Sequence, residues 1–227
     1  GETVKLCAFA GKAAARVREA TSHPASTIHR LLGYNGKQFM CESLAGQSII
    51  IDEASMIDAA LLAEVVNRNP RRLVLVGDQA QLPPVGRGQP FHDLINTRPD
   101  LVSNLTTCYR ATEAVYNAAS IIREGGRPAM QATSDNEKWS IKNTGNAKQT
   151  HAKILSWVNA WFFDFEQDVI LVARNGESNE DPATVRGLNA AIVDAISPRD
   201  DKTPFVTGDR VMNLKNMPEL DVWNGTT

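Results

Sequence analysis

Two adjacent acids, Asp52 and Glu53, follow a run of three isoleucines at residues 49–51. A run of β-branched residues is typical of a parallel strand buried on both faces, and open α/β sheets bind ligands at the carboxyl ends of their strands. In that position Asp52 can hold Mg²⁺ through a water shell, and Glu53 can take a proton from an attacking water. The structural alternative is a helix N-cap beside a solvated acid.

A second apolar run, residues 73–76, ends in Gly77 and Asp78. Gln81 follows, and its side-chain amide can donate a hydrogen bond to a phosphate oxygen. The next residues, "PPVGRG" at 83–88, combine two stiff prolines with two hinge-like glycines. A loop of this composition suits a segment that transmits the state of a bound nucleotide to another surface.

Near the N-terminus, Gly11 and Lys12 stand between an apolar run and an Ala-rich run. This arrangement is similar to the phosphate-binding loop G-x-x-x-x-G-K-[ST], in which the last residue binds Mg²⁺ through its hydroxyl. Two defining positions differ: Leu6 stands five residues before Gly11, and Ala13 after Lys12 has no oxygen. We therefore exclude a phosphate-binding loop at this place, and Lys12 by itself fits a solvated helix residue.

Composition limits the class of protein. The chain has 227 residues, of which 42% are hydrophobic, and this suffices for one large or two small domains. A net charge of −2 gives no overall basic field for nucleic acid, although a local groove is compatible with it. Three widely spaced cysteines fit no disulfide framework or zinc site, so we expect a cytoplasmic protein. No apolar run approaches the length of a membrane span, so we expect no membrane partner.

Strand and helix patterns alternate over about the first 125 residues, which predicts an α/β fold with a parallel sheet. Residues 127–150 are polar and rich in turn formers, and they place a domain boundary near 130–138. Beyond this boundary we expect a second α/β unit with short strands at its end. The expected strands are 4–10, 46–56, 71–78 and 167–173, and the expected helices are 11–21, 27–33, 58–70, 112–126, 151–163 and 184–196.

Five segments, taken in order, resemble successive motifs of superfamily 1 DNA helicases of the RecD-like branch, the exodeoxyribonuclease V alpha subunit family. They are "FAGKAAARVREAT…ASTIHRLLG", "IIIDEASMID", "LVLVGDQAQLPPVGRGQPF", "LTTCYRATE" and "TGDRVMNLKN…VWNGT". The resemblance implies a RecA-like parallel-sheet domain of the P-loop NTPase type over residues 1–133, without its P-loop unit. It further implies part of a second RecA-like domain over 134–202 and the start of a small inserted β-barrel over 203–227.

For the nucleotide side, the resemblance implies ATP and Mg²⁺ as cofactors. Asp52 would order the Mg²⁺ through water and Glu53 would activate the attacking water. Gln81 and Arg110 would hold the γ-phosphate, as suits a side-chain amide and a guanidinium fork. Asp78 belongs to the motif that couples γ-phosphate sensing to the grip on DNA.

The same resemblance gives Tyr109 an adenine-stacking role, for which a core tyrosine is the structural alternative. For the DNA side it implies contacts with single-stranded DNA from Gly11, Lys12, Thr27 and His29. Gly11 lets the backbone approach a phosphate, and Lys12 can pair with one. His29 has a helix-packing role as its structural alternative.

The resemblance therefore implies an ATP-dependent 5′-to-3′ DNA helicase or translocase on single-stranded DNA, with partner subunits of a recombination or repair complex as further candidates. It also implies an internal piece of a longer protein, so we expect weak ATP binding and no useful hydrolysis from this chain alone. Two alternatives remain open: a non-catalytic DNA-binding or scaffold module that lost its P-loop, and the helicase part of a relaxase or nuclease complex.

Overall fold

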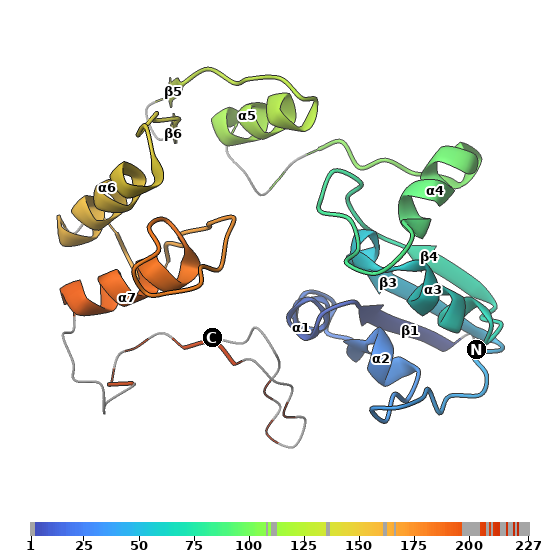
Figure 1. Ribbon diagram of the computed structural model, residues 1–227. Coiled ribbons are helices and arrows are strands. Elements are labelled where there is room, and N and C mark those ends of the chain that lie inside the picture. The colour runs from blue at the N-terminus through green and yellow to red at the C-terminus, as the bar shows by residue number, and fades with distance from the viewer. Residues whose placement is uncertain are drawn as a thin grey trace. The chain divides into compact units, whose positions relative to one another are not determined.

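The computed structural model describes residues 3–107, 109, 113–134, 137–160, 163–165, 167–196, 205–207, 209, 211–213, 217, 220 and 222. The chain divides into two compact units (Figure 1). The first consists of Gly1–Thr107 with Val211–Thr227, and the second of Cys108–Arg210. The sequence-based domain bounds of 1–133, 134–202 and 203–227 remain a prediction.

The first unit is built on a four-stranded parallel sheet with the strand order β2-β1-β3-β4. Helices alternate with these strands along the chain, so the predicted α/β class with a parallel sheet is confirmed (Figure 1). The elements are β1 Thr3–Ala8, α1 Gly11–Thr21, β2 Ala25–Thr27, α2 Ile28–Leu31, β3 Gln47–Asp52, the 3₁₀ turn η1 Ala54–Met56, α3 Ala59–Val66, β4 Arg72–Leu75, α4 Pro90–Thr97 and the 3₁₀ turn η2 Pro99–Leu101.

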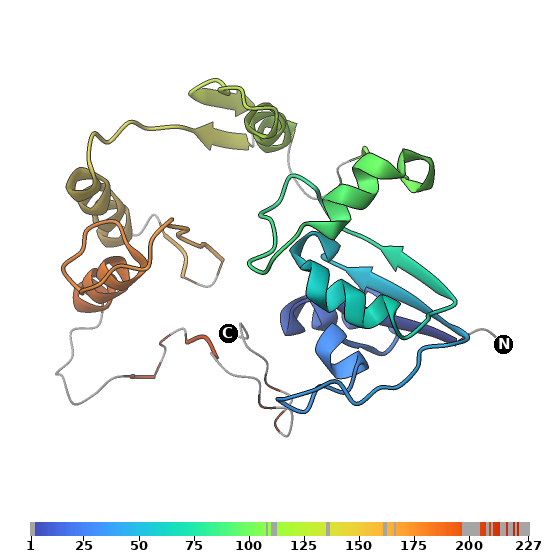
Figure 2. The ribbon, with the colours of Figure 1, turned by 45° about the vertical axis from the view of Figure 1, so that its right-hand side comes forward.

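The core of this unit lies between β3 and two helices. Ile49 and Ile51 point to the same face of β3, because side chains alternate along a strand, and both are fully buried. They belong to one hydrophobic cluster with Ile28 of α2 and with Leu61 and Val65 of α3, which crosses that face of the sheet (Figure 2). This packing holds β3 rigidly, and β3 carries Asp52 at its end.

The second unit contains three helices and one β-hairpin among its described residues. These are α5 Glu113–Arg123, β5 Gln131–Ser134, β6 Glu137–Ser140, α6 Ala147–Asn159 and α7 Val185–Ile196. Asn146 and Gln149 form a capping box at the start of α6, each side chain accepting from the other's backbone N–H. None of the described helices has the length and apolar character that a bilayer crossing requires.

The prediction of a strand at residues 167–173 was wrong. The structure gives these residues no strand, and the side chains of Val169 and Leu171 are exposed. A strand needs a neighbour for its backbone groups, and the described strands of this unit, β5 and β6, pair with each other. The apolar composition of the run suggested burial that the fold around it does not supply.

Cys7 on β1 provides a chemical probe of this sheet. Its side chain is buried, and desolvation of the thiolate raises the pKa of the Cys7 thiol to about 12. Because the thiolate is the reactive form, we expect iodoacetamide at pH 8 to modify the half-buried Cys41 and to spare Cys7. Peptide mass spectrometry with and without urea measures this. Equal modification of both cysteines without urea would contradict the packing of β1.

Candidate functional site at the carboxyl edge of the parallel sheet

The strand register places two predicted site residues on one edge of the sheet. Ala8 pairs with Thr27 on one side and with Asp52 on the other, so the carboxyl ends of β2, β1 and β3 are level. Since neighbouring strands lie about 4.8 Å apart, Thr27 and Asp52 are separated by roughly 10 Å of sheet. The predicted DNA-contacting Thr27 and the predicted Mg²⁺-ordering Asp52 therefore share this edge.

The backbone at Glu53 turns sharply away from the strand. Glu53 has φ 54° and ψ 41°, the left-handed region that a non-glycine residue enters at a cost. The neighbouring backbone is fixed by hydrogen bonds from Val76 N to Ile51 O and from Ala54 N to Val76 O, both 2.8 Å. Strain held in place by such bonds is common at functional sites. The structural alternative for these acids, a helix N-cap, is met only in part, because Glu53 stands at the N-cap position of η1 but its side chain makes no cap hydrogen bond.

The acid pair fits a magnesium site that is completed by water and phosphate. Asp52 and Glu53 are both half-buried at the sheet edge. Among the described residues no group of three His, Cys, Asp or Glu side chains could hold a metal by itself. Mg²⁺ is usually bound by one or two carboxylates together with waters and substrate phosphates, so a single carboxylate from Asp52 agrees with the expected role.

The loop after β4 is an ordered turn. The Asp78 carboxylate accepts from Ala80 N at 2.9 Å, and the Asp78 carbonyl accepts from Gln81 N at 3.1 Å. Gln81 itself is exposed. A Cβ on Gly77 would lie 3.0 Å from Ser55 N, so this glycine allows the two strand ends to meet. Asp78 thus shapes the turn that presents Gln81.

His92, which the sequence reasoning did not select, fixes the same loop from α4. Its Nε2 lies 2.7 Å from the Gln79 carbonyl, a distance at which the N–H tautomer donates a hydrogen bond. The 13-residue separation between these partners follows no local pattern, so the sequence carried no signal for it.

The glycines at 86 and 88 serve close packing. A Cβ on Gly86 would lie 1.9 Å from Asp58 Oδ2, and one on Gly88 would lie 2.8 Å from the Ala59 Cβ. Asp58 caps α3 by accepting from Leu61 N at 2.8 Å, and Ala59 N donates to Arg87 O at 3.0 Å. The loop therefore folds back onto the N-terminus of α3.

The predicted DNA contacts gather between α1 and β2. Gly11 and Thr27 line one small cavity of about 20 Å³ together with Arg18 and Arg30. Lys12 is exposed in the first turn of α1. The Thr27 hydroxyl accepts from Arg30 N at 3.2 Å and so caps α2, but its own hydrogen can still be donated to a phosphate.

His29 packs against the rings of Tyr34 and Phe39, which lie after α2 and in no helix, so it is not the helix-packing histidine of the structural alternative. Its ring centroid lies 5.6 Å from that of Tyr34 and 5.9 Å from that of Phe39. The side chain is nevertheless only half-buried, so packing and contact with a ligand are compatible.

Two predicted residues belong to the second unit. Tyr109 is 94% exposed, which does not fit a core tyrosine. Arg110 lies outside the described residues.

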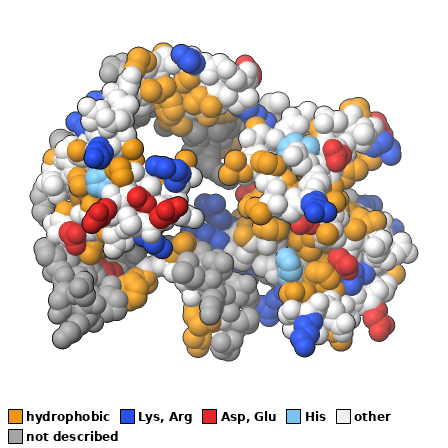
Figure 3. Space-filling model, viewed as in Figure 1, with side chains coloured by type: hydrophobic (Ala, Val, Ile, Leu, Met, Phe, Trp, Pro, Cys, Tyr) orange, Lys and Arg blue, Asp and Glu red, His pale blue; other side chains and the backbone are white. Residues whose placement is uncertain are grey.

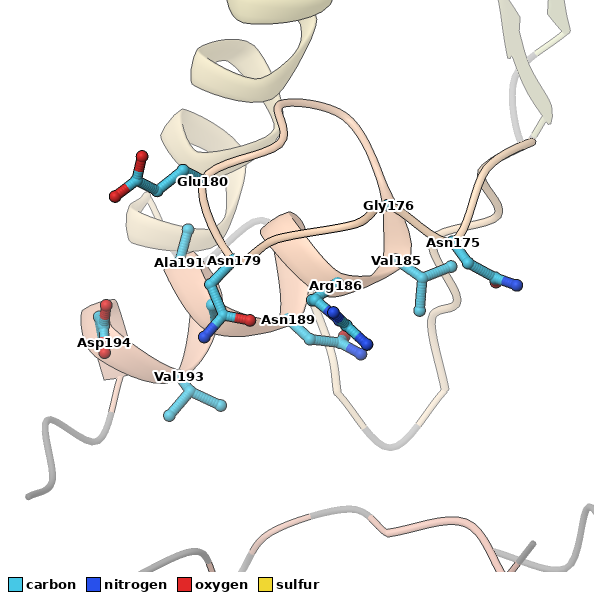
Figure 4. Close-up of a pocket in the computed structure, with 11 residues that line it drawn as sticks. Asn175, Gly176, Asn179, Glu180, Val185, Arg186, Asn189, Ala191, Val193 and Asp194 are labelled. Atoms are coloured by element: carbon cyan, nitrogen blue, oxygen red, sulfur yellow. The ribbon is translucent and has the colours of Figure 1, made fainter. Parts of the chain in front are cut away.

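The second unit also contains an open cavity of about 910 Å³, between α7 and the preceding loop (Figure 4). None of the predicted residues lines it. Arg186 and Asn189 lie three residues apart on α7, while Glu180 and Asp194 bring negative charge to the same cavity. Backbone N–H groups of Ser178 and Glu177 lower the pKa of the nearby Asp181 carboxyl, which orders the loop. The cavity carries charges of both signs, which does not favour the binding of a phosphate. The candidate site is therefore the carboxyl edge of the sheet.

The charges on the face drawn in Figure 3 do not indicate a ligand of one sign. Basic and acidic side chains are interspersed on the face shown in Figure 3, in keeping with the net charge of −2. The described residues on this face therefore form no extended basic patch.

Comparison with known proteins agrees with the motif resemblance. A family model described as an AAA domain matches residues 1–144. The "ATP-dependent RecD2 DNA helicase" of Deinococcus radiodurans is 40% identical over 136 residues, covering 57% of this chain and 19% of that protein. The "RecBCD enzyme subunit RecD" of Mycolicibacterium smegmatis is 33% identical over 154 residues, covering 57% of this chain and 28% of that protein. This chain thus spans less than a third of the length of either relative.

A solved structure, Pif1 helicase from Bacteroides in complex with ADP-AlF3 and ssDNA, is 20% identical to this chain. The match covers 75% of this chain and 49% of the Pif1 chain. Its TM-score of 0.32 is too low to add to the description of the fold. The family model, by contrast, covers more than half of the chain and agrees with the parallel sheet, so the RecA-like α/β class is confirmed. The chain therefore belongs to the AAA domain family and is similar in sequence to the RecD-type DNA helicases.

Proposed function

We propose that this chain is part of an ATP-dependent DNA helicase that moves 5′ to 3′ along single-stranded DNA. The observation that carries the proposal is the level register of Thr27, Ala8 and Asp52, which brings a predicted DNA contact and a predicted nucleotide contact to one edge. The similarity to RecD-type helicases supports it.

In the proposed reaction, a water oxygen attacks the γ-phosphorus of ATP, the bond from this phosphorus to the bridging oxygen of the β-phosphate breaks, and ADP and phosphate leave. Bound Mg²⁺ supplies charge neutralisation on the phosphates. The Asp52 carboxylate, half-buried at the end of β3, would hold the ion through water. Glu53 would accept the proton of the attacking water. Its left-handed backbone turns the chain out of the direction of β3 at this residue. Gln81 would donate from its exposed amide to a γ-phosphate oxygen.

Three further roles are part of this proposal. Arg110 would stabilise the negative charge that develops on the γ-phosphate, for which a guanidinium fork is suited. Tyr109, whose ring is largely exposed, would stack on the adenine. Asp78 would act indirectly, since its carboxylate shapes the turn that presents Gln81.

The 227 residues contain no G-x-x-x-x-G-K-[ST] loop, the element that supplies most of the phosphate-binding amides. We therefore propose that ATP is bound with the help of residues outside this sequence, and that this chain alone is inactive as an ATPase. A cytoplasmic location and partner subunits of a recombination or repair complex belong to the same proposal.

Lys12→Ala tests the DNA side of the proposal. We expect weaker binding of single-stranded DNA and a salt dependence, log K against log[salt], that is shallower by about one unit, because one phosphate contact is lost. Fluorescence anisotropy with a labelled oligonucleotide over a series of KCl concentrations measures both quantities. Lys148→Ala, at a lysine on α6 that is also exposed, is the matched control. An unchanged slope for Lys12→Ala would exclude this contact.

A further inference from the structure

A short hairpin after α2 presents an aromatic side chain in a fixed position. Tyr34 and Phe39 form an antiparallel bridge. Between them, the Asn35 side-chain oxygen accepts from Lys37 N and Gln38 N, both at 3.0 Å, and Asn35 N donates to Gln38 O. Gly36 takes φ +93° at the tip, a conformation that favours glycine. The turn is therefore ordered by its own hydrogen bonds.

The hairpin is also fixed to α2, next to the predicted DNA contact His29. Tyr34 N donates to His29 O at 2.8 Å. The Tyr34 ring meets the His29 ring edge-on at 5.6 Å and lies 5.0 Å from the Phe39 ring, and the Arg68 guanidinium lies 5.7 Å from Phe39. Phe39 and His29 thus support Tyr34 from within.

Tyr34 is the outer member of this cluster. It is 46% exposed, while Phe39 is half-buried in contact with the core. An aromatic ring that is held rigidly and still presents much of its surface is suited to stack on a nucleobase, because little side-chain entropy remains to be lost on binding.

The charge around the hairpin favours an anionic strand. No acid occurs between Glu19 and Glu42, although the chain contains 26 acidic residues, and Arg30 and Lys37 lie within this interval. Lys37 is exposed at the hairpin and Arg30 is exposed on α2. A polyanion with bases, such as single-stranded DNA, fits both the cations and the ring.

We propose that Tyr34 stacks on one base of single-stranded DNA, with Lys37 and Arg30 near the flanking phosphates. This inference rests on the proposed function and deepens it. The predicted contacts at Gly11, Lys12 and Thr27 would engage the sugar-phosphate backbone, whereas Tyr34 would add a contact that needs a base. Stacking involves the face common to all bases, so this contact does not select a sequence.

The experiment compares two ligands of equal charge and length: an oligothymidylate of about 20 nucleotides and an abasic deoxyribose-phosphate strand. We expect Tyr34→Leu to weaken binding of the oligothymidylate by roughly 5- to 100-fold, the range for loss of one stacked base, and to leave binding of the abasic strand unchanged. Tyr34→Phe keeps the ring and should bind like the wild type. Tyr116→Leu, at a tyrosine on α5 that is 41% exposed, is the control.

The outcomes separate the inference from the proposed function. Suppose that Tyr34→Leu leaves the affinity for both strands unchanged, or lowers both affinities by the same factor, while Lys12→Ala weakens the binding of both strands. The stacking contact is then wrong, and the DNA-binding proposal stands. If the wild-type chain binds neither strand, both are wrong. Photocrosslinking of wild-type protein to a 5-iododeoxyuridine oligonucleotide gives a second test that needs no substitution: the crosslink should map to Tyr34, and a crosslink pattern without Tyr34 would overturn the inference.

Discussion

Glu53→Gln is expected to lower the ATP turnover of a helicase that contains this chain by about 10²- to 10⁴-fold, the usual contribution of a general base. Glutamine has nearly the shape of glutamate but cannot accept the proton. The left-handed backbone at residue 53 should persist, because it is held by the bonds of Ala54 and Val76. Binding of ATP should therefore remain close to that of the unchanged protein.

Phosphate release measures turnover, and equilibrium titration with a fluorescent ATP analogue measures binding. Glu42→Gln, an exposed acid of the same unit, is the control for loss of one negative charge. Hydrolysis that persists in Glu53→Gln would assign the base to another residue. A parallel loss of ATP binding would instead indicate that Glu53 holds the nucleotide in place.

Ile51→Ala should lower the free energy of unfolding of the first unit by about 2–5 kcal/mol, the usual cost of removing a large aliphatic side chain from a core. Ile51 is fully buried in the cluster formed with α2 and α3. Urea denaturation followed by circular dichroism measures the change. Val74→Ala on β4, where the side chain is partly exposed, should cost less than about 1 kcal/mol.

Equal effects of Ile51→Ala and Val74→Ala would contradict the described arrangement, in which the inner face of β3 is packed and Val74 is partly open to solvent. The comparison is informative because both substitutions are made in neighbouring strands of one sheet. A difference between the two free energies of unfolding would therefore reflect the burial of the side chains and not the strand propensity of the residues.

Local patterns predicted three strands and three helices of the first unit, namely β1, β3, β4, α1, α2 and α3, but they missed the short strand β2 and the helix α4. The helix expected at 11–21 is α1, because Gly11 follows an apolar strand and the Ala-rich run has high helix propensity. The isoleucine run predicted a buried parallel strand, which is β3. In the second unit the same reasoning failed at 167–173, where apolar composition does not supply a partner strand, and it overlooked the polar hairpin β5–β6.

The residue types of the candidate site come from the sequence and their roles stay a prediction, whereas their arrangement comes from the structure. Motif order identified Asp52 and Thr27, yet only the strand register places them on one edge. The turn role of Asp78 depends on hydrogen bonds with Ala80 and Gln81, and the contact between His92 and Gln79 joins residues 13 apart. Such contacts are set by tertiary structure, which no local pattern of a single sequence encodes.

The level ends of β2, β1 and β3 have a mechanical consequence. Thr27 and Asp52 are joined through Ala8 by continuous inter-strand pairing, so they form parts of one rigid body. In the proposed helicase, a displacement of Asp52 would therefore carry Thr27 with it, without a relay of side-chain movements between them. The proposed DNA contact and the proposed nucleotide contact would thus move as one piece, and the spacing between them would stay fixed.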